Sequence, residues 1–189
     1  MKKWVATVLA LVMALSVTTM AWAEGNWTGS GTEADPYVIT TEAGLNKLAT
    51  DVNNGTVYCD TYFKLGASIT VTDWTPIGQK GSDNKFAGTF DGNGQTVTIN
   101  GINSGLGSAF DGYAGFFGAV KGATIKNLTV AGTISGSDVA GVVARLDGAS
   151  KVINCINKAN VTGTSKAAGI TDKIDGTNVV IDDCTNDGE

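Results

Sequence analysis

The sequence predicts an all-β fold, a parallel β-helix (solenoid) of about five coils preceded by one amphipathic helix. Composition is the first reason, because 26 Gly and only 2 Pro accompany recurring Thr, Val, Ile and Asn, which is typical of short strands joined by tight turns. The second is an internal repeat at spacings of 27 and 29 residues. The third is that only one segment has the hydrophobic period of a helix.

The N-terminus predicts a signal peptide over residues 1–23. Met1-Lys2-Lys3 supplies a positive start, and the apolar stretch from Trp4 to Met20 is short for a membrane span. Ala21-Trp22-Ala23 places small residues at both positions that a signal peptidase inspects, so we expect cleavage before Glu24. An uncleaved anchor is the alternative. Cleavage predicts a secreted or extracellular protein of a bacterial cell surface.

Residues 24–55 are predicted to form an N-terminal cap that contains the helix. From Thr41 to Asn53 the apolar residues recur at i, i+3, i+4 and i+7, and they are Leu45, Leu48, Ala49 and Val52. Thr41 is a suitable N-cap, and Gly55 follows the end of the segment.

Residues 56–189 are predicted to form the parallel β-helix. Its first strands show apolar residues spaced in twos, namely Phe63, Leu65, Ile69, Val71, Val97 and Ile99. Asp91-Gly92-Asn93-Gly94 predicts a tight turn between strands. As a calcium loop it lacks, in sequence, the further carboxylates that an oxygen cage requires.

The repeat defines the later coils. Ile125-Lys126-Asn127-Leu128 aligns with Val152-Ile153-Asn154-Cys155 and with Ile181-Asp182-Asp183-Cys184. Upstream, Ala114-Gly115-Phe116-Phe117 aligns in the same way with residues 140–143 and 168–171. Each unit combines β-branched residues with far too much glycine for a helix, so we expect strands stacked coil on coil, with equivalent residues above one another.

These residues resemble the GLUG-motif β-helix repeats of bacterial surface proteins and adhesin-like secreted proteins. The resemblance covers nearly all of the predicted mature chain, and its quoted segments are residues 31–39, 74–78, 86–94 and the naming motif Gly115-Phe116-Phe117-Gly118. It implies a right-handed parallel β-helix, capped by the helix, displayed outside the cell and without catalytic residues. The motif decays to Gly141-Val142-Val143-Ala144 and Gly169-Ile170-Thr171-Asp172, which leaves the regularity of the last coil open.

Composition disfavours several classes of function. Of 13 basic residues, Lys2 and Lys3 fall in the predicted signal peptide, which leaves 11 against 18 acidic residues and a net charge of −7. This charge disfavours nucleic acid and anionic membranes as partners. The chain has no histidine, which removes the usual general base, zinc ligand and Ser/His or Cys/His pair.

Six aspartates are the candidates for acid/base chemistry, because polysaccharide lyases and hydrolases also use β-helices. Most of them stand beside Gly, Ser or Asn in expected turns, which favours solvated side chains, and they are Asp138, Asp147, Asp172, Asp175, Asp182 and Asp183. Arg145, the single arginine, has no partner that the sequence identifies. We therefore predict a protein that is not an enzyme, and we assign no catalytic, cofactor-binding or metal-ligating residue and no cofactor.

Repeat positions also make predictions for Asn and Cys. Asn127, Asn154 and Asp183 share one position and Val130, Asn157 and Asn186 another, which predicts a partial asparagine ladder at a corner. A polar stripe for glycan binding is the alternative. Cys155 and Cys184 replace Leu128, so we expect inward-facing thiols, with a strained disulfide as the alternative.

Aromatic residues of the first coils are predicted to pack in the core and cap, with stacking on sugars as the alternative; they are Trp27, Tyr37, Tyr58, Tyr62, Trp74 and Tyr113. The leading prediction is a non-catalytic surface module for adhesion or extracellular ligand binding, and a polysaccharide lyase or glycoside hydrolase is the alternative. Partners would be an extracellular glycan or a cell-surface protein. Because the last repeat ends in mid-turn, we also expect end-to-end self-association or a longer parent chain.

Overall fold

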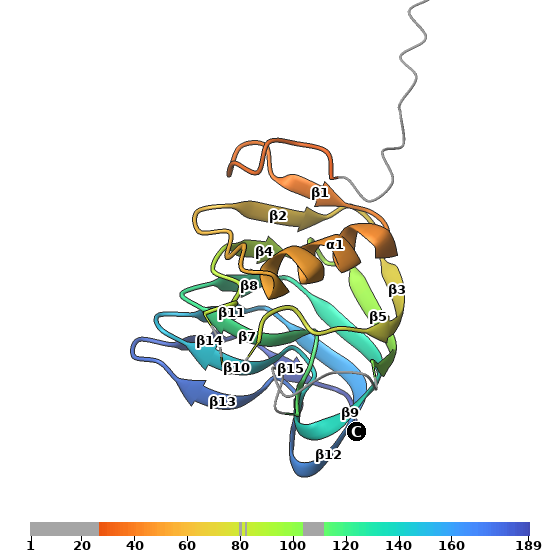
Figure 1. The fold of residues 1–189 in the computed structure, drawn as a ribbon. Coiled ribbons are helices and arrows are strands. Elements are labelled where there is room, and N and C mark those ends of the chain that lie inside the picture. Colours follow the sequence, from red (N-terminus) through yellow and green to blue (C-terminus); the bar gives the residue numbers. More distant parts are fainter. Residues whose placement is uncertain (1–26, 80, 82, 104–111) are drawn as a thin grey trace, which may run out of the picture.

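The computed structural model describes residues 27–79, 81, 83–103 and 112–189. These residues form a parallel β-solenoid of about five turns with one α-helix, as the sequence predicts (Figure 1). The predicted signal peptide over residues 1–23 lies outside the described residues.

The strands stack in three columns, each of which forms a parallel sheet. The first column contains β1 (Tyr37–Ile39), β2 (Tyr62–Leu65), β4 (Thr89–Asp91), β8 (Thr124–Lys126), β11 (Lys151–Ile153) and β14 (Val180–Asp182). The second contains β3 (Ile69–Trp74), β5 (Thr96–Ile102), β9 (Thr129–Ala140), β12 (Ile156–Ala168) and β15 (Thr185–Asn186), with β6 (Tyr113–Ala114) beside β9. The third contains β7 (Phe117–Lys121), β10 (Val143–Asp147) and β13 (Thr171–Asp175).

The register of these sheets is the register of the sequence repeat. Val143 pairs with Phe117 on one side and Thr171 on the other. Ile125, Val152 and Ile181 likewise lie in line across β8, β11 and β14. The last coil therefore keeps its pairing although its Gly-x-x-Gly signature has decayed.

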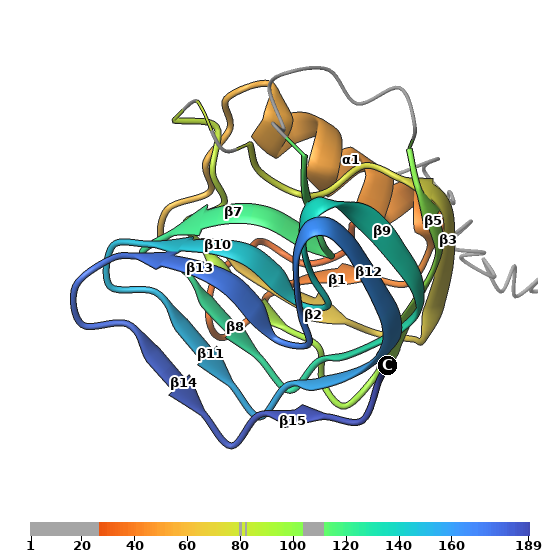
Figure 2. The same ribbon diagram turned by 90° about the horizontal axis from the view of Figure 1, so that it is seen from below.

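Helix α1 (Glu42–Asn53) begins where the sequence predicts. Thr41 is the N-cap, and its side-chain oxygen accepts a hydrogen bond from the Gly44 amide at 3.2 Å. Its apolar stripe is buried in the common core. In Figure 1 α1 lies above β7, and Figure 2 places both on the same side of the solenoid, so the helix closes the side of the first coils where the third column has no strand.

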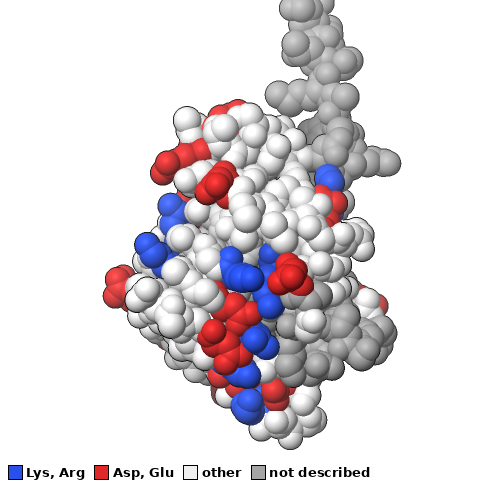
Figure 3. All heavy atoms as spheres, turned by 60° about the vertical axis from the view of Figure 1, so that its left-hand side comes forward, with Lys and Arg blue, Asp and Glu red and all other residues white. Residues whose placement is uncertain are grey.

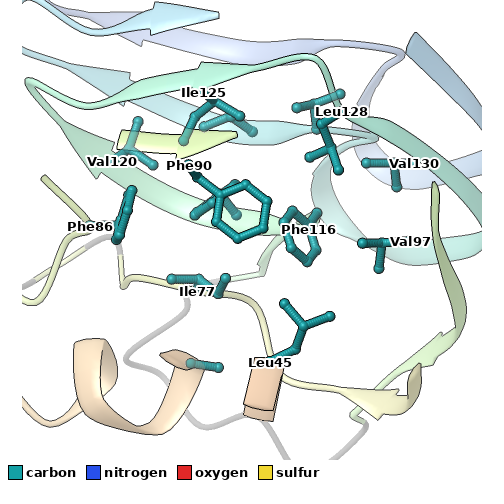
Figure 4. Close-up of a cluster of buried hydrophobic side chains, with 14 of the residues drawn as sticks. Leu45, Ile77, Phe86, Phe90, Val97, Phe116, Val120, Ile125, Leu128 and Val130 are labelled. Carbon is teal, nitrogen blue, oxygen red and sulfur yellow. The ribbon is translucent and has the colours of Figure 1, made fainter. Parts of the chain in front are cut away.

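Aromatic rings fill the core beneath α1 (Figure 4). Trp74 and Phe116 stack with ring centroids 5.4 Å apart, and Phe116 also packs on Phe90 and Phe117. All four side chains are fully buried. Their indole and phenyl rings bury the large apolar areas that dominate the stability of a core.

The glycine of the repeated Ala-Gly pair is explained by a side chain of the facing column. A Cβ atom on Gly141 would overlap the side-chain oxygen of Asn157, and one on Gly169 would overlap that of Asn186. Asn157 is buried and donates to Asn186 at 2.7 Å and to the Ala159 carbonyl at 3.2 Å. Val130 and Asn157 are buried at this repeat position and only Asn186, in the last coil, is exposed, so the position faces inward, which corrects the prediction that it lies at a corner.

The other predicted ladder does lie at a corner. Asn127, Asn154 and Asp183 all have left-handed backbones, with φ of 53°, 50° and 49°. Asn154 donates to the side chain of Asn127 at 2.9 Å, and Asn127 donates to Asp91 at 3.0 Å. Asp91 also forms an ion pair with Lys126 and accepts a hydrogen bond from the Asn93 amide. Its carboxylate therefore stabilises both the ladder and the turn that follows β4.

Candidate functional site

The fold distributes the six candidate aspartates over three places. Asp147 and Asp175 meet on β10 and β13, whereas Asp138 and Asp172 approach the same lysine, Lys166. Asp182 and Asp183 are exposed at the corner after β14 and have no ion pair among the described residues. No single site therefore brings all the candidates together.

The first place is an ion-pair cluster, which we call the charged cluster: Lys85, Arg145, Asp147, Lys173 and Asp175. Arg145 contacts Asp147 at 2.8 Å and Asp175 at 2.9 Å, and Lys85 contacts the other Asp147 oxygen at 2.9 Å. Lys173 contacts Asp175 at 3.0 Å. Figure 3 shows such acidic and basic side chains interspersed on this face of the molecule.

The charged cluster corrects two expectations from the sequence. Asp147 lies on a strand and is only 7% exposed, so it is not a solvated turn residue. Arg145 does have partners, because residues i and i+2 of a strand share a face and Asp175 is the register partner of Asp147 in the next coil. The alternation of side chains along a strand could have predicted the contact between Arg145 and Asp147. The contact between Arg145 and Asp175 depends on the register between neighbouring coils.

Electrostatics keep Asp147 ionised. Burial by itself raises the pKa of Asp147, but the hydrogen bonds and charges of Arg145 and Lys85 outweigh it and hold this pKa below the ordinary value. The hydrogen bond that Arg145 donates to Asp147, together with the charges of Asp147 and Asp175, raises the pKa of Arg145 despite its desolvation. A carboxylate in this state has no proton to donate near neutral pH, which disfavours a role as general acid.

The second place is the pair Asp138 and Asp172. Their carboxylates lie 3.6 and 3.9 Å from the Lys166 ammonium, and their side chains are 16% and 5% exposed. Oδ2 of Asp172 and Oγ1 of Thr171 are buried without a hydrogen-bond partner among the described residues. Asp172 is thus the one of the six aspartates whose side chain has a buried oxygen without a hydrogen-bond partner in the described part of the chain.

A hollow of about 440 Å³ lies between α1 and the end of β3, and we call it the α1 hollow. Apart from Ala49, polar residues line it, and they are Asn46, Thr50, Asn53, Asn54, Thr72, Asp73, Thr75 and Gln79. The sequence analysis did not predict this site. Its two walls are separated by some 20 residues in the chain, and no local motif marks them as neighbours.

The aromatic residues support the packing interpretation. Trp74 and Tyr113 are buried, and Trp27 packs on Tyr37, Tyr58 and Phe63 with ring centroids 5.0 to 6.0 Å apart. The Tyr58 hydroxyl donates to Asp51 at 2.7 Å, which ties this aromatic group to α1. These rings therefore bind the first coils to the helix rather than form an exposed stacking platform.

All three cysteines have free thiols in the structure. Cys155 is buried as predicted, and burial raises the pKa of its thiol to about 12. Cys184 is partly buried and packs against the core, whereas Cys59 is exposed. The stacked pair is thus part of the core lining.

Two further searches cover only the part of the chain that the structure describes. No group of three or more His, Cys, Asp or Glu side chains gathers there in a metal-binding arrangement. In the same residues, no helix has the length and apolar character needed to cross a membrane.

Two known proteins contain segments similar to this chain. Over 169 residues the chain is 29% identical to Halomucin of Haloquadratum walsbyi, which covers 85% of this chain and 2% of Halomucin. Over 113 residues it is 31% identical to a "Putative Gly-rich membrane protein" of Evansella cellulosilytica, which covers 55% of this chain and 12% of that protein. The chain therefore spans a small part of each relative.

A solved structure shares the fold. It is described as a "putative immunoglobulin A1 protease" of Bacteroides ovatus, and it superposes with a TM-score of 0.57 at 20% identity over 85% of this chain and 59% of that one. At this identity the likeness concerns the β-helical fold alone. No family model matches the chain, so the resemblance to GLUG-motif repeats stays a prediction. The chain is a β-solenoid similar to short segments of Halomucin and of a protein described as a Gly-rich membrane protein.

Proposed function

We propose that this chain is a non-catalytic β-helix module of a secreted or cell-surface bacterial protein, and that it serves adhesion or extracellular ligand binding. The charged cluster is the observation that carries the proposal. Its carboxylates are neutralised by Arg145, Lys85 and Lys173, so they brace neighbouring coils and are not poised to exchange protons. The similarity to segments of long surface and membrane proteins supports the same role.

A solenoid suits this role for a physical reason. Each coil contacts only its neighbours, so the surface can be long and rigid while its exposed residues vary without disturbing the core. Binding then depends on exposed polar side chains held by a fixed backbone.

The proposal is tested by binding and by turnover on the same preparation. We expect the purified chain, fused to a fluorescent reporter, to bind saturably to at least one of mucin, extracellular-matrix protein or insoluble polysaccharide. The reporter alone is the control. No reducing ends and no unsaturated products should appear from pectin, alginate or host glycans. Absence of binding to every one of these surfaces would count against the module.

An enzyme of the lyase or hydrolase type is the second candidate, and Asp138 and Asp172 are the observation that favours it. These two carboxylates are partly buried, and both of them contact the ammonium group of Lys166. Turnover of a polysaccharide that falls sharply in both Asp138→Asn and Asp172→Asn would establish this candidate. Asp182→Asn is the matched control, because Asp182 is exposed and forms no ion pair with Lys166.

A further inference from the structure

The α1 hollow is built by two walls that the core fixes in place. On the helix, Asn46, Thr50 and Asn53 follow the i, i+4, i+7 spacing of one face, while the opposite stripe is buried. Toward the end of β3, two adjacent exposed side chains, Thr72 and Asp73, line the hollow. The helix face and the strand end thus present polar side chains to one concave surface.

A break in the β3 alternation produces the second wall. Thr72 pairs with Asn100 and Trp74 with Ile102, while Asp73 between them has φ of 55° and is exposed like Thr72. A left-handed backbone at a residue other than glycine costs free energy, which the surrounding structure must offset. Here it buries Trp74 and leaves two adjacent polar side chains at the hollow.

Hydrogen bonds between the walls make the hollow rigid. The Asn53 side chain donates to the Pro76 carbonyl at 3.0 Å and accepts from the Gly78 amide at 2.9 Å. Glu42, at the start of the helix, accepts from the Thr72 amide at 2.8 Å. A site whose walls are already connected loses little conformational entropy when a ligand binds.

Several lining side chains are left with unused hydrogen-bonding capacity. Within the described residues, five of them form no hydrogen bond or ion pair, and they are Asn46, Thr50, Asn54, Thr72 and Asp73. Together they offer amide donors, amide and carboxylate acceptors, and hydroxyls that serve as both. Vicinal hydroxyl groups, which donate and accept from adjacent carbons, match such a set.

The chemistry of the lining excludes other ligand classes. None of its described residues is basic, which disfavours phosphate or carboxylate ligands, and Ala49 is its single apolar residue, which disfavours an apolar ligand. Asp73 is the one carboxylate among the described lining residues, which is too few for a calcium cage. The volume of about 440 Å³ lies within the range of small-molecule sites.

We infer that the α1 hollow is a binding subsite for a neutral saccharide, with Asn46 and Thr50 on one side of the sugar and Thr72 and Asp73 on the other. The inference rests on the proposed function and deepens it by naming the site and the ligand class. The net negative charge of the chain agrees with a neutral ligand, because it repels anionic ones.

The test is titration calorimetry and saturation-transfer NMR of the full chain with cellobiose, xylobiose, maltose, mannobiose and lactose. We expect millimolar binding of at least one, weakened about tenfold or more in the double variant Asn46→Ala, Thr50→Ala, because two or more hydrogen bonds are lost. Asp73→Asn keeps a residue that tolerates φ of 55° and should weaken binding about threefold, because the charge-assisted hydrogen bond of the carboxylate becomes a neutral one. Thr70→Ala and Asn160→Ala, both exposed outside the hollow, should bind as the unaltered chain does.

Three outcomes would overturn the inference: no binding of any of these sugars, binding that the double variant leaves unchanged, or preference for a uronic-acid disaccharide over the neutral ones. Circular dichroism of the double variant must match that of the unaltered chain, and a second variant, Asn54→Ala with Thr72→Val, repeats the test from the other wall. Surface binding of the unaltered chain is scored separately. If it persists while all five sugars fail, this inference falls and the proposed module stands; if it is absent, the proposed module itself fails.

Discussion

The last coil and the coils that precede it share one backbone plan but bury their inward side chains very differently. Val120 and Leu146 on β7 and β10 are fully buried, whereas Ile174, the equivalent residue on β13, is 50% exposed. Ile125 and Val152 are fully buried, and their equivalent Ile181 is 41% exposed. At the other end, α1 and an aromatic cluster cover the core.

The comparison shows that a repeat position does not by itself define a core residue. In a solenoid each coil is covered by the next, so an inward side chain is buried only where another coil or a cap lies against it. The N-terminal coils have such a cap in α1, and the described part of the C-terminal coil does not. We therefore expect apolar burial to contribute far more free energy of unfolding per residue in the first coils.

The sharpest test of this contrast compares Phe116→Ala with Ile181→Ala. Phe116 is fully buried among Trp74, Phe90 and Phe117, so its truncation should lower the free energy of unfolding by about 3 to 5 kcal/mol. Ile181→Ala should cost about 1 kcal/mol or less, because that side chain is already partly in water. Urea unfolding followed by circular dichroism measures both; equal losses would refute the contrast.

The charged cluster offers a second contrast, between the more buried carboxylate of Asp147 and the more exposed carboxylate of Asp175. Asp147→Asn leaves Lys85 and Arg145 without their shared buried counter-charge and should cost about 2 to 4 kcal/mol. Asp175→Asn, at a more exposed carboxylate, should cost about 1 kcal/mol or less. Urea midpoints at pH 7 separate the two variants.

The loss of stability in Asp147→Asn should depend on pH in a defined direction. The pKa of Asp147 is lowered in the folded chain, so its stabilising contribution is complete above the ordinary aspartate pKa of about 4 and is lost as pH falls through the lower folded value. The stability gap between the unaltered chain and Asp147→Asn should therefore shrink in acid. A gap that widens below this range would contradict the ion-pair interpretation.

The corner ladder should give a smaller effect. Asn154→Ala removes the hydrogen bond to Asn127 and places alanine at φ of 50°, which together should cost about 1 to 2 kcal/mol. Asn154→Gly restores the backbone freedom and isolates the hydrogen bond. Asn160→Ala, at an exposed strand position, is the control and should change stability by about 0.5 kcal/mol at most.

The reactivity of the three thiols should also follow their burial, and it can be measured without a substitution. In the folded chain, a thiol reagent should modify Cys59 first, Cys184 next and Cys155 only on unfolding, because burial raises the pKa of the Cys155 thiol to about 12. Denatured, unreduced protein should titrate three free thiols. A count of one would mean that Cys155 and Cys184 form a disulfide.

Local sequence signals were sufficient for the elements and their stacking. Thr41 and the stripe from Leu45 to Val52 predicted α1, and the alignment of residues 125–128 with 152–155 and 181–184 predicted the register that β8, β11 and β14 adopt. Side-chain periodicity and turn chemistry depend on residues within one coil, so they are readable along the chain.

The sites depend on contacts between coils, and the sequence alone did not predict them. The sequence predicted Asp147 to be a solvated turn carboxylate. In the structure it lies on β10 beside Arg145 and contacts Lys85 from the segment before β4. The α1 hollow exists because a helix side chain, Asn53, is hydrogen-bonded to the segment after β3.

By itself, then, the sequence determined the solenoid, its repeat and its single helix, because each follows from spacing within short segments. Only the tertiary structure decided which aspartates are neutralised, which Asn ladder is buried and where the chain is hollow. Those properties arise from the summed positions of side chains on different coils, and small rotations between coils change which side chains meet. Burial at the last coil was also a tertiary outcome, since it depends on what covers the coil and not on the residues within it.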